Sequence, residues 1–242
     1  MSLPVCFQRL LLSIAIISSA PANAGISLDS TRIILDEKNS KSGANIQVNS
    51  SQTSETPYLI KAQVTQDISG QKRNVPFITT PSLFRLDPGN SNQVRIIPKS
   101  HSFPEDRESV FYFRVAALPA QAQDENGNTS RVGGDLQLAS GNVIKLFYRP
   151  AGLTLLPGKA ADRLIFSSAQ NGIKVINPTP YFLTLTSLKI NGHAVNIRTE
   201  PGSNMIPPKS EEIFATPHRQ GKVQWQVIND YGGVEEFNGT VQ

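Results

Sequence analysis

The sequence predicts an all-β protein made of two β-sandwich domains. Short segments of the chain alternate between apolar and polar residues with the two-residue period of a strand. Turns rich in Gly, Pro and Asn separate these segments, and helical periodicity is scarce. The chain has 242 residues, of which 38% are hydrophobic and 17% are charged. This is enough for two packed cores and excludes wholesale disorder.

The first 24 residues have the layout of a secretory signal peptide. Arg9 precedes the apolar run Leu10–Ile17, and residues 22–24 (Ala-Asn-Ala) have the small-x-small form that signal peptidase needs. A buried N-terminal helix is the alternative. We expect residues 1–24 to be removed on export, together with Cys6, the only cysteine, which lowers the net charge from +4 to +3. The exported protein then has no disulfide, no thiolate metal site and no integral membrane segment.

Residues 25–150 are expected to form the first sandwich. The aromatic and β-branched segment 109–115 is typical of a central strand. Other strands are expected at 26–35, 44–48, 58–64, 93–97 and 136–148, with turns at 41–43, 55–57, 69–70 and 87–90. Turn signals about 8–12 residues apart are typical of β-sandwiches. Residues 120–134 are polar and aperiodic, which predicts a mobile loop.

A stiff junction at Arg149, Pro150 and Gly152 marks the predicted domain boundary, so a second, smaller sandwich is expected in residues 151–242. Its strands are predicted at 164–166, 173–176, 182–185, 212–214 and 223–227. The Asn-Gly pairs at 171–172 and 191–192 are the strongest hairpin signals in the chain.

Signals for catalysis are nearly absent. The three histidines, His101, His193 and His218, lie in polar, turn-rich contexts and at spacings that do not match a metal site. The sequence has no G-x-S-x-G elbow, no P-loop and no G-x-G-x-x-G motif. The basic residues are scattered, so a nucleic-acid-binding stripe is not indicated. We expect no enzyme, no cofactor, no metal and no nucleic-acid partner.

Five charged residues interrupt strand-like, apolar segments. They are Arg32, Glu108, Lys145, Arg149 and Asp230. Burial of a charge is unfavourable unless the charge is paired or binds a charged ligand. The alternative is that each side chain faces solvent from a strand surface or an edge. The pattern of residues alone leaves both interpretations open.

Six segments spread over nearly the whole exported chain form a recognisable set. They are LDSTR (28–32), TPSLFRLDPG (80–89), DRESVFYF (106–113), IKLFYRP (144–150), NPTPY (177–181) and INDYGG (228–233). In this order they resemble the signature segments of the periplasmic pilus-assembly chaperones, the PapD-like chaperones of the chaperone–usher pathway. The resemblance implies two immunoglobulin-like domains set at an angle, an interdomain cleft, and no catalysis.

The resemblance also implies roles for the five charged residues. Arg32 and Lys145 match the basic pair that anchors the C-terminal carboxylate of a pilin subunit. Charge-assisted hydrogen bonds suit that role, because they are stronger than neutral ones. Glu108, Arg149 and Asp230 match an interdomain charge network that fixes the angle between the domains, with an ordinary surface triad as the alternative.

The mechanism implied by the resemblance is donor-strand complementation, in which a chaperone strand completes a pilin domain that lacks its last strand. Counting back by two from Ile144 puts four candidate donor residues on one face: Val132, Leu136, Leu138 and Ser140. Ser140 stands where a third bulky apolar residue is common in the family. Gly141 is compatible with a bulge that changes the register. Ordinary core packing is the alternative role for the two leucines.

We therefore expect a periplasmic chaperone that binds, folds and caps pilus subunits and delivers them to an outer-membrane usher. An exposed apolar strand promotes aggregation, so the free protein is expected to hide this strand, for example by self-association. The alternative function is an exported two-domain, immunoglobulin-like adhesin or structural subunit. A secreted hydrolase has no residue constellation to support it.

Overall fold

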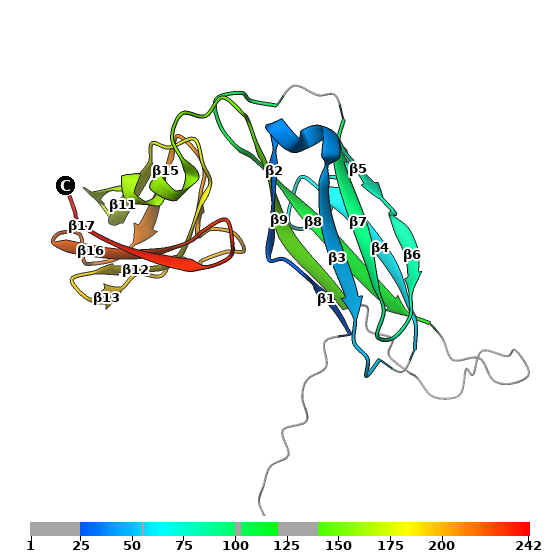
Figure 1. The fold of residues 1–242 in the computed structure, drawn as a ribbon. Helices are drawn as coiled ribbons and strands as arrows, with labels where there is room; N and C mark the ends of the chain where they lie inside the picture. Colours follow the sequence, from blue (N-terminus) through cyan, green and yellow to red (C-terminus); the bar gives the residue numbers. More distant parts are fainter. Residues whose placement is uncertain (1–24, 55, 100–102, 121–139) are drawn as a thin grey trace, which may run out of the picture.

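The computed structural model describes residues 25–242 except 55, 100–102 and 121–139. It is nearly all β, and its strands form two sandwiches that lie at an angle to each other (Figure 1). The prediction of an all-β, two-sandwich protein is confirmed. The predicted signal peptide (1–24) and nearly all of the predicted loop at 120–134 lie outside the described residues. No helix in the described part of the chain is long and apolar enough to cross a membrane.

The described residues of the N-terminal sandwich form these strands and one 3-10 helix: β1 (Ile26–Leu28), β2 (Arg32–Asp36), η1 (Glu37–Ser42), β3 (Ala44–Ser50), β4 (Tyr58–Thr65), β5 (Phe77–Thr80), β6 (Leu83–Leu86), β7 (Ser91–Pro98), β8 (Ser109–Pro119) and β9 (Ser140–Arg149). One sheet has the strand order β1-β3-β7-β5 and the other has the order β2-β9-β8-β4-β6. Among these pairings only β2 with β9 is parallel. The segment predicted as one strand at 26–35 is two strands, because residues 29–31 carry the chain from one sheet to the other.

Strand periodicity explains the N-terminal core. In β8, Phe111, Phe113, Val115 and Ala117 are buried, while the residues between them are more exposed. The inward residues of β3, β4, β7 and β9 pack against them in one cluster. Because successive strand residues point to opposite faces, β8 presents its other residues on the outer surface of its sheet.

The C-terminal sandwich is built from the rest of the chain: η2 (Pro157–Lys159), η3 (Ala161–Arg163), β10 (Ile165–Ala169), β11 (Gly172–Asn177), β12 (Leu183–Ile190), β13 (His193–Ala194), β14 (Met205–Ile206), β15 (Ser210–Ala215), β16 (Lys222–Ile228) and β17 (Val234–Thr240). Its sheets have the orders β10-β11-β15 and β13-β12-β16-β17, with β14 also pairing with β12. Trp225 is buried between Phe166 and Phe237, and its indole N–H donates to the carbonyl of Ala161 at 3.1 Å.

Both predicted hairpins form, but the turn residues of the first are Gln170 and Asn171, and Gly172 is the first residue of β11. Asn191 and Gly192 have φ angles of 49° and 83° and join β12 to β13, as a primed turn requires. Five strands were not predicted: β5, β6, β13, β14 and β17. Strands β13 and β14 have two residues each, and β17 is an edge strand that is exposed along most of its length. Two-residue strands and exposed edge strands do not show the clear apolar alternation that identifies a half-buried strand.

Candidate functional site

The parallel ladder between β2 and β9 places Arg32 directly beside Lys145. These two strands form the side of the N-terminal sandwich that faces the C-terminal sandwich (Figure 1). Both side chains reach across: Arg32 Nη1 donates to the carbonyl of Ile228 at 3.3 Å, and Lys145 Nζ donates to Thr184 Oγ1 at 3.0 Å. The structure therefore brings the two predicted anchor residues together between the domains.

Among the described residues, no acidic side chain forms a salt bridge with either cation of this pair. The buried Nε of Arg32 has no hydrogen-bond partner in this part of the chain. Burial, with a smaller contribution from the charge of Arg32, lowers the pKa of Lys145 from 10.5 to about 8. Burial also lowers the pKa of Arg32, against the opposing effect of two more distant carboxylates. The arrangement is therefore a pair of neighbouring, partly buried cations that contact a backbone carbonyl and a hydroxyl group.

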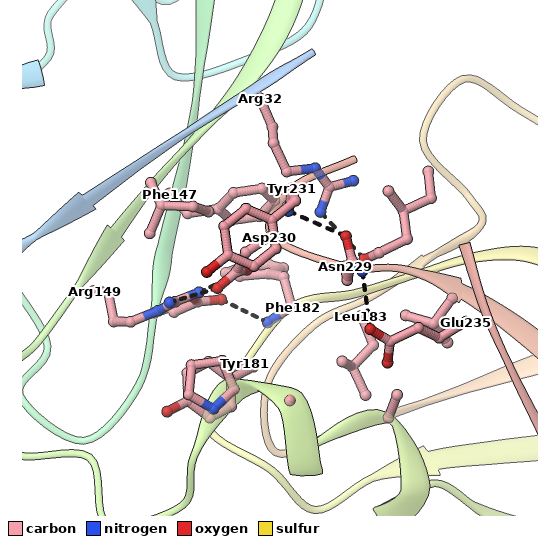
Figure 2. Close-up of a pocket in the computed structure, with 17 residues that line it drawn as sticks. Arg32, Phe147, Arg149, Tyr181, Phe182, Leu183, Asn229, Asp230, Tyr231 and Glu235 are labelled. Atoms are coloured by element: carbon pink, nitrogen blue, oxygen red, sulfur yellow. Dashed lines mark hydrogen bonds and ion pairs between the residues drawn. The ribbon is translucent and has the colours of Figure 1, made fainter. Parts of the chain in front are cut away.

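Two acids of the region, Glu108 and Asp230, belong to a neighbouring network centred on Arg149. Its guanidinium binds Glu108 at 2.8 Å, and it binds Asp230 through two hydrogen bonds of 2.8 and 3.0 Å. It also lies 5.1 Å from the ring centre of Tyr181. Figure 2 shows Arg149 and Asp230 joined in this way on one side of the pocket, with Arg32 on another. The three residues predicted as an interdomain network are thus in direct contact.

Glu108 is the most enclosed member of this network, with an exposed fraction of 4%. Burial raises its pKa, and the charge of Arg149 and a hydrogen bond from the Phe182 N–H oppose that rise. Burial opposes the charge on Arg149, but its two carboxylate partners raise its pKa above the ordinary value overall. The backbone N–H of Glu108 donates to the carbonyl of Pro180 at 2.9 Å. Glu108 is therefore bonded to the C-terminal sandwich by both its side chain and its backbone.

Sequence reasoning missed a further ion pair between the sandwiches. Lys209 Nζ lies 2.5 Å from Asp106 Oδ2, and Arg107 donates to both oxygens of the same carboxylate, at 3.0 and 3.2 Å. The hydrogen bonds from Arg107 and Lys209 lower the pKa of Asp106 to about 2. Both residues are exposed, and the residues around them show no pattern that links two positions so far apart in the chain.

Asn177 organises the loop that receives Glu108. Its side-chain amide donates to the carbonyls of Tyr181, Ile206 and Pro207, while its oxygen accepts from the N–H and the hydroxyl of Thr179. This fully buried residue fixes residues 178–182, which carry the two backbone groups bonded to Glu108.

We expect Asn177→Ala to lower the free energy of unfolding by at least about 2 kcal/mol, because it leaves several buried backbone groups without partners. Urea unfolding followed by the fluorescence of Trp225 measures this loss. Asn196→Ala, at an exposed position of the same domain, is the control and should change stability by less than about 0.5 kcal/mol. Equal stabilities of the two variants would contradict the role given to Asn177.

Of the predicted donor residues, only Ser140 is described; it is the first residue of β9, and Val132, Leu136 and Leu138 lie outside the described residues. The expected change of register at Gly141 is absent, because β8 and β9 pair without interruption from Ser109–Tyr148 to Ala117–Ser140. A Cβ at Gly141 would lie 3.1 Å from the carbonyl oxygen of Val115. The glycine therefore permits a close strand approach rather than a bulge.

The first half of β9 forms an open sheet edge in the described structure. Strand β2 pairs only with Lys145–Arg149, whereas residues 140–144 pair with β8 alone. The open edge thus begins directly beside the Arg32–Lys145 pair. Unpaired backbone groups along such an edge can accept a further strand.

The described residues contain no group of three or more His, Cys, Asp or Glu side chains that could hold a metal ion. The rings of His193 and His218 do stack, with centroids 3.9 Å apart, although nothing in their sequence spacing indicates a pair. Two parallel imidazoles do not direct their ring nitrogens at a common point, so this pair does not form a metal site in the geometry shown.

Two family models together cover most of the chain. Residues 25–154 match the model described as "Pili and flagellar-assembly chaperone, PapD N-terminal domain", and residues 159–238 match "Pili assembly chaperone PapD, C-terminal domain". This chain belongs to the PapD family of pilus-assembly chaperones. Membership confirms the family resemblance and the immunoglobulin-like character of both sandwiches.

Individual proteins that are similar to this chain are also named as chaperones. It is similar to the probable fimbrial chaperone protein ElfD of Escherichia coli O157:H7, with 37% identity over 88% of this chain and 85% of that protein. The crystal structure of the E. coli chaperone DraB is similar, with a TM-score of 0.74, 32% identity, and 90% and 96% of the two chains covered. The Salmonella enterica chaperone SafB, solved in complex with the SafA pilin, has a TM-score of 0.74 and 28% identity over 89% and 96% of the chains. The protein is thus a pilus-assembly chaperone, and the alternative of an adhesin or structural subunit is not favoured.

Proposed function

We propose that this chaperone captures pilin subunits in the periplasm by binding the subunit's C-terminal carboxylate at Arg32 and Lys145. The observation that carries the proposal is the pair itself: two partly buried cations, side by side, with no contacting acid among the described residues. A carboxylate between them would replace the weak contacts to Ile228 and Thr184 with charge-assisted hydrogen bonds. The SafB chaperone, which is similar to this chain, is seen with a pilin bound.

The open edge of β9 supplies the second part of the proposal. A subunit whose carboxylate is held at Lys145 has its preceding residues next to residues 140–144. On that side these residues have no backbone pairing partner in the described structure, although the Asn142 side chain donates to the carbonyl of Ile26. Main-chain hydrogen bonds to this edge add a strand to the sheet, and alternate side chains give specificity. We propose that Ser140, Leu138, Leu136 and Val132 fill the groove of the incomplete subunit, and that the pilin-binding domain ends near Pro150.

Further steps complete the proposed cycle. The free chaperone covers its donor segment by self-association, and the loaded chaperone passes its subunit to an outer-membrane usher. An apolar patch on the outer face of the N-terminal sheet is available for that transfer, since Leu59 and Leu118 pair across β4 and β8 and Leu83 lies on the neighbouring β6. Binding alone accounts for this cycle, so no catalytic step is proposed.

Leu138→Ser is expected to lower capture of subunits at least about tenfold, because it removes an apolar side chain from the groove that excludes water. The measurement is the yield of pilin that co-purifies with the tagged chaperone from periplasm after co-expression. Ile213→Ser, which alters an exposed apolar residue of the C-terminal sandwich, is the control and should keep the wild-type yield. A wild-type yield for Leu138→Ser would contradict the donor role.

A further inference from the structure

The turn between β16 and β17 presents an aromatic side chain at the rim of the interdomain cleft. Tyr231 has an exposed fraction of 97%, the highest among the exposed large hydrophobic residues of the described chain. Two hollows adjoin it: one lies between the sandwiches and includes Phe147, and the other runs along residues 28–31. Arg32 also lines both hollows. Figure 2 shows Tyr231 and Arg32 among the residues around the first of them.

The backbone that carries this ring is firmly held. The side-chain oxygen of Asn229 accepts from the N–H of Tyr231 at 3.1 Å and from the N–H of Gly233 at 2.9 Å. The amide group of Asn229 donates to Glu235 at 2.9 Å, and the neighbouring Asp230 is bound by Arg149. Residues on both sides of Tyr231 are therefore fixed, while its own side chain makes no hydrogen bond within the described structure.

Gly232 sets the turn against the N-terminal domain. Its φ of 83° favours glycine, and a Cβ at this position would lie 2.8 Å from Thr31 Oγ1. The turn thus abuts the segment that leads directly into Arg32. A tyrosine on a fixed backbone offers a large, amphipathic contact at little cost in conformational entropy, as in the binding loops of antibodies.

We propose that Tyr231 is a subunit-recognition residue whose ring packs on an apolar side chain among the last residues of the pilin subunit. This inference rests on the proposed function, because the cationic pair determines the occupant: a chain end with a carboxylate. Since Tyr231 lines both hollows that Arg32 lines, a chain whose terminus is held at Arg32 passes beside this ring. Arg32 and Lys145 then hold the terminus, and Tyr231 selects the side chain next to it.

Fluorescence anisotropy with labelled eight-residue peptides tests this inference. The peptides alternate Ser and Val, end in either Phe or Ala, and carry either a free carboxylate or a carboxamide. We expect the wild-type chaperone to bind the Phe-ending acid more tightly than the Ala-ending acid. Tyr231→Ala should weaken binding of the Phe-ending acid about three- to tenfold and that of the Ala-ending acid less than about twofold. Tyr231→Phe, the conservative variant, should retain the preference.

The results of this experiment distinguish the proposed carboxylate anchor from the proposed role of Tyr231. If acid and amide bind equally to the wild type, the carboxylate anchor is wrong and the inference about Tyr231 fails with it. If the acid is preferred, and Arg32→Ala abolishes that preference, the anchor stands. Equal effects of Tyr231→Ala on the Phe- and Ala-ending acids would then overturn the role of Tyr231 alone. Circular dichroism of each variant checks that the fold is retained.

Discussion

Lys145→Met is expected to abolish subunit capture and, at the same time, to stabilise the free chaperone. Burial lowers the pKa of this lysine from 10.5 to about 8, so keeping it charged in the folded state is unfavourable by roughly 3 kcal/mol, since one pKa unit corresponds to about 1.4 kcal/mol. Methionine keeps much of the apolar stem without the charge. In the proposed function, the charge of Lys145 lowers the stability of the free chaperone and strengthens binding of the subunit, a combination that is common at functional sites.

The expected loss of binding is large. Removing one partner of a buried, hydrogen-bonded charge pair costs about 2–5 kcal/mol, which is a factor of roughly 30 to several thousand in affinity. Calorimetric titration with a pilin subunit measures this loss, and urea unfolding measures the gain in stability. Lys189→Met, at an exposed position of β12, is the matched control and should change neither. Retained affinity in Lys145→Met, or lower stability, would contradict this account.

The lowered pKa of Lys145 also determines how the stability of the chaperone changes with pH. Between about pH 8 and 10.5 the unfolded chain holds a proton on Lys145 that the folded chain has lost, so the stability of the wild type rises with pH relative to that of Lys145→Met. Affinity for the subunit falls over the lower part of this range, because a neutral amine is a weak partner for a carboxylate. Unfolding and titration from pH 7 to 9.5 measure both trends. A stability difference that does not depend on pH would contradict the low pKa.

Arg149→Met is expected to lower the free energy of unfolding by about 3–5 kcal/mol, because it leaves Glu108 buried without its cation. It also removes the two hydrogen bonds to Asp230, so the angle between the sandwiches should become less well defined. Urea unfolding and small-angle X-ray scattering measure the two effects. The double variant Glu108→Gln/Arg149→Met, which removes both buried charges, should recover much of the stability.

Lowering the pH should restore part of the stability that the single variant Arg149→Met has lost. Burial already raises the pKa of Glu108, and loss of Arg149 removes the charge and the hydrogen bond that oppose this rise. A carboxyl group whose folded-state pKa lies above its unfolded value contributes stability at low pH, and that stability is lost as the pH rises through the folded-state pKa. Arg149→Met should therefore regain stability between pH 7 and 5. A variant with unchanged or falling stability over this range would contradict the buried, unpaired state of Glu108.

The local sequence pattern was sufficient to predict strands that have one buried face and turns that require a particular backbone geometry. Residues 109–115 and 223–227 alternate clearly, and Asn191-Gly192 adopts the positive φ angles that its turn needs. The pattern failed for β6, a short strand between Pro81 and Asp87, and for β17, whose exposed edge requires no apolar alternation.

The candidate site depends on pairings that no local pattern specifies. Arg32 and Lys145 become neighbours only through the parallel register of β2 and β9, and the sequence pointed to them through a family resemblance. Nothing comparable indicated the contact between Asp106 and Lys209, since both are exposed residues in turn-rich surroundings. Periodicity reports which face of a strand is buried, whereas contacts between domains depend on how the two cores are joined.

The central claim is that Arg32 and Lys145 hold the subunit's terminal carboxylate. The most direct measurement compares the affinity of the chaperone for a pilin subunit with its natural carboxylate and for the same subunit ending in a carboxamide, made by intein cleavage with ammonia. We predict that the amide lowers affinity at least about 30-fold for the wild type and less than about threefold for the double variant Arg32→Gln/Lys145→Met. Equal affinities of the wild type for acid and amide would contradict the claim.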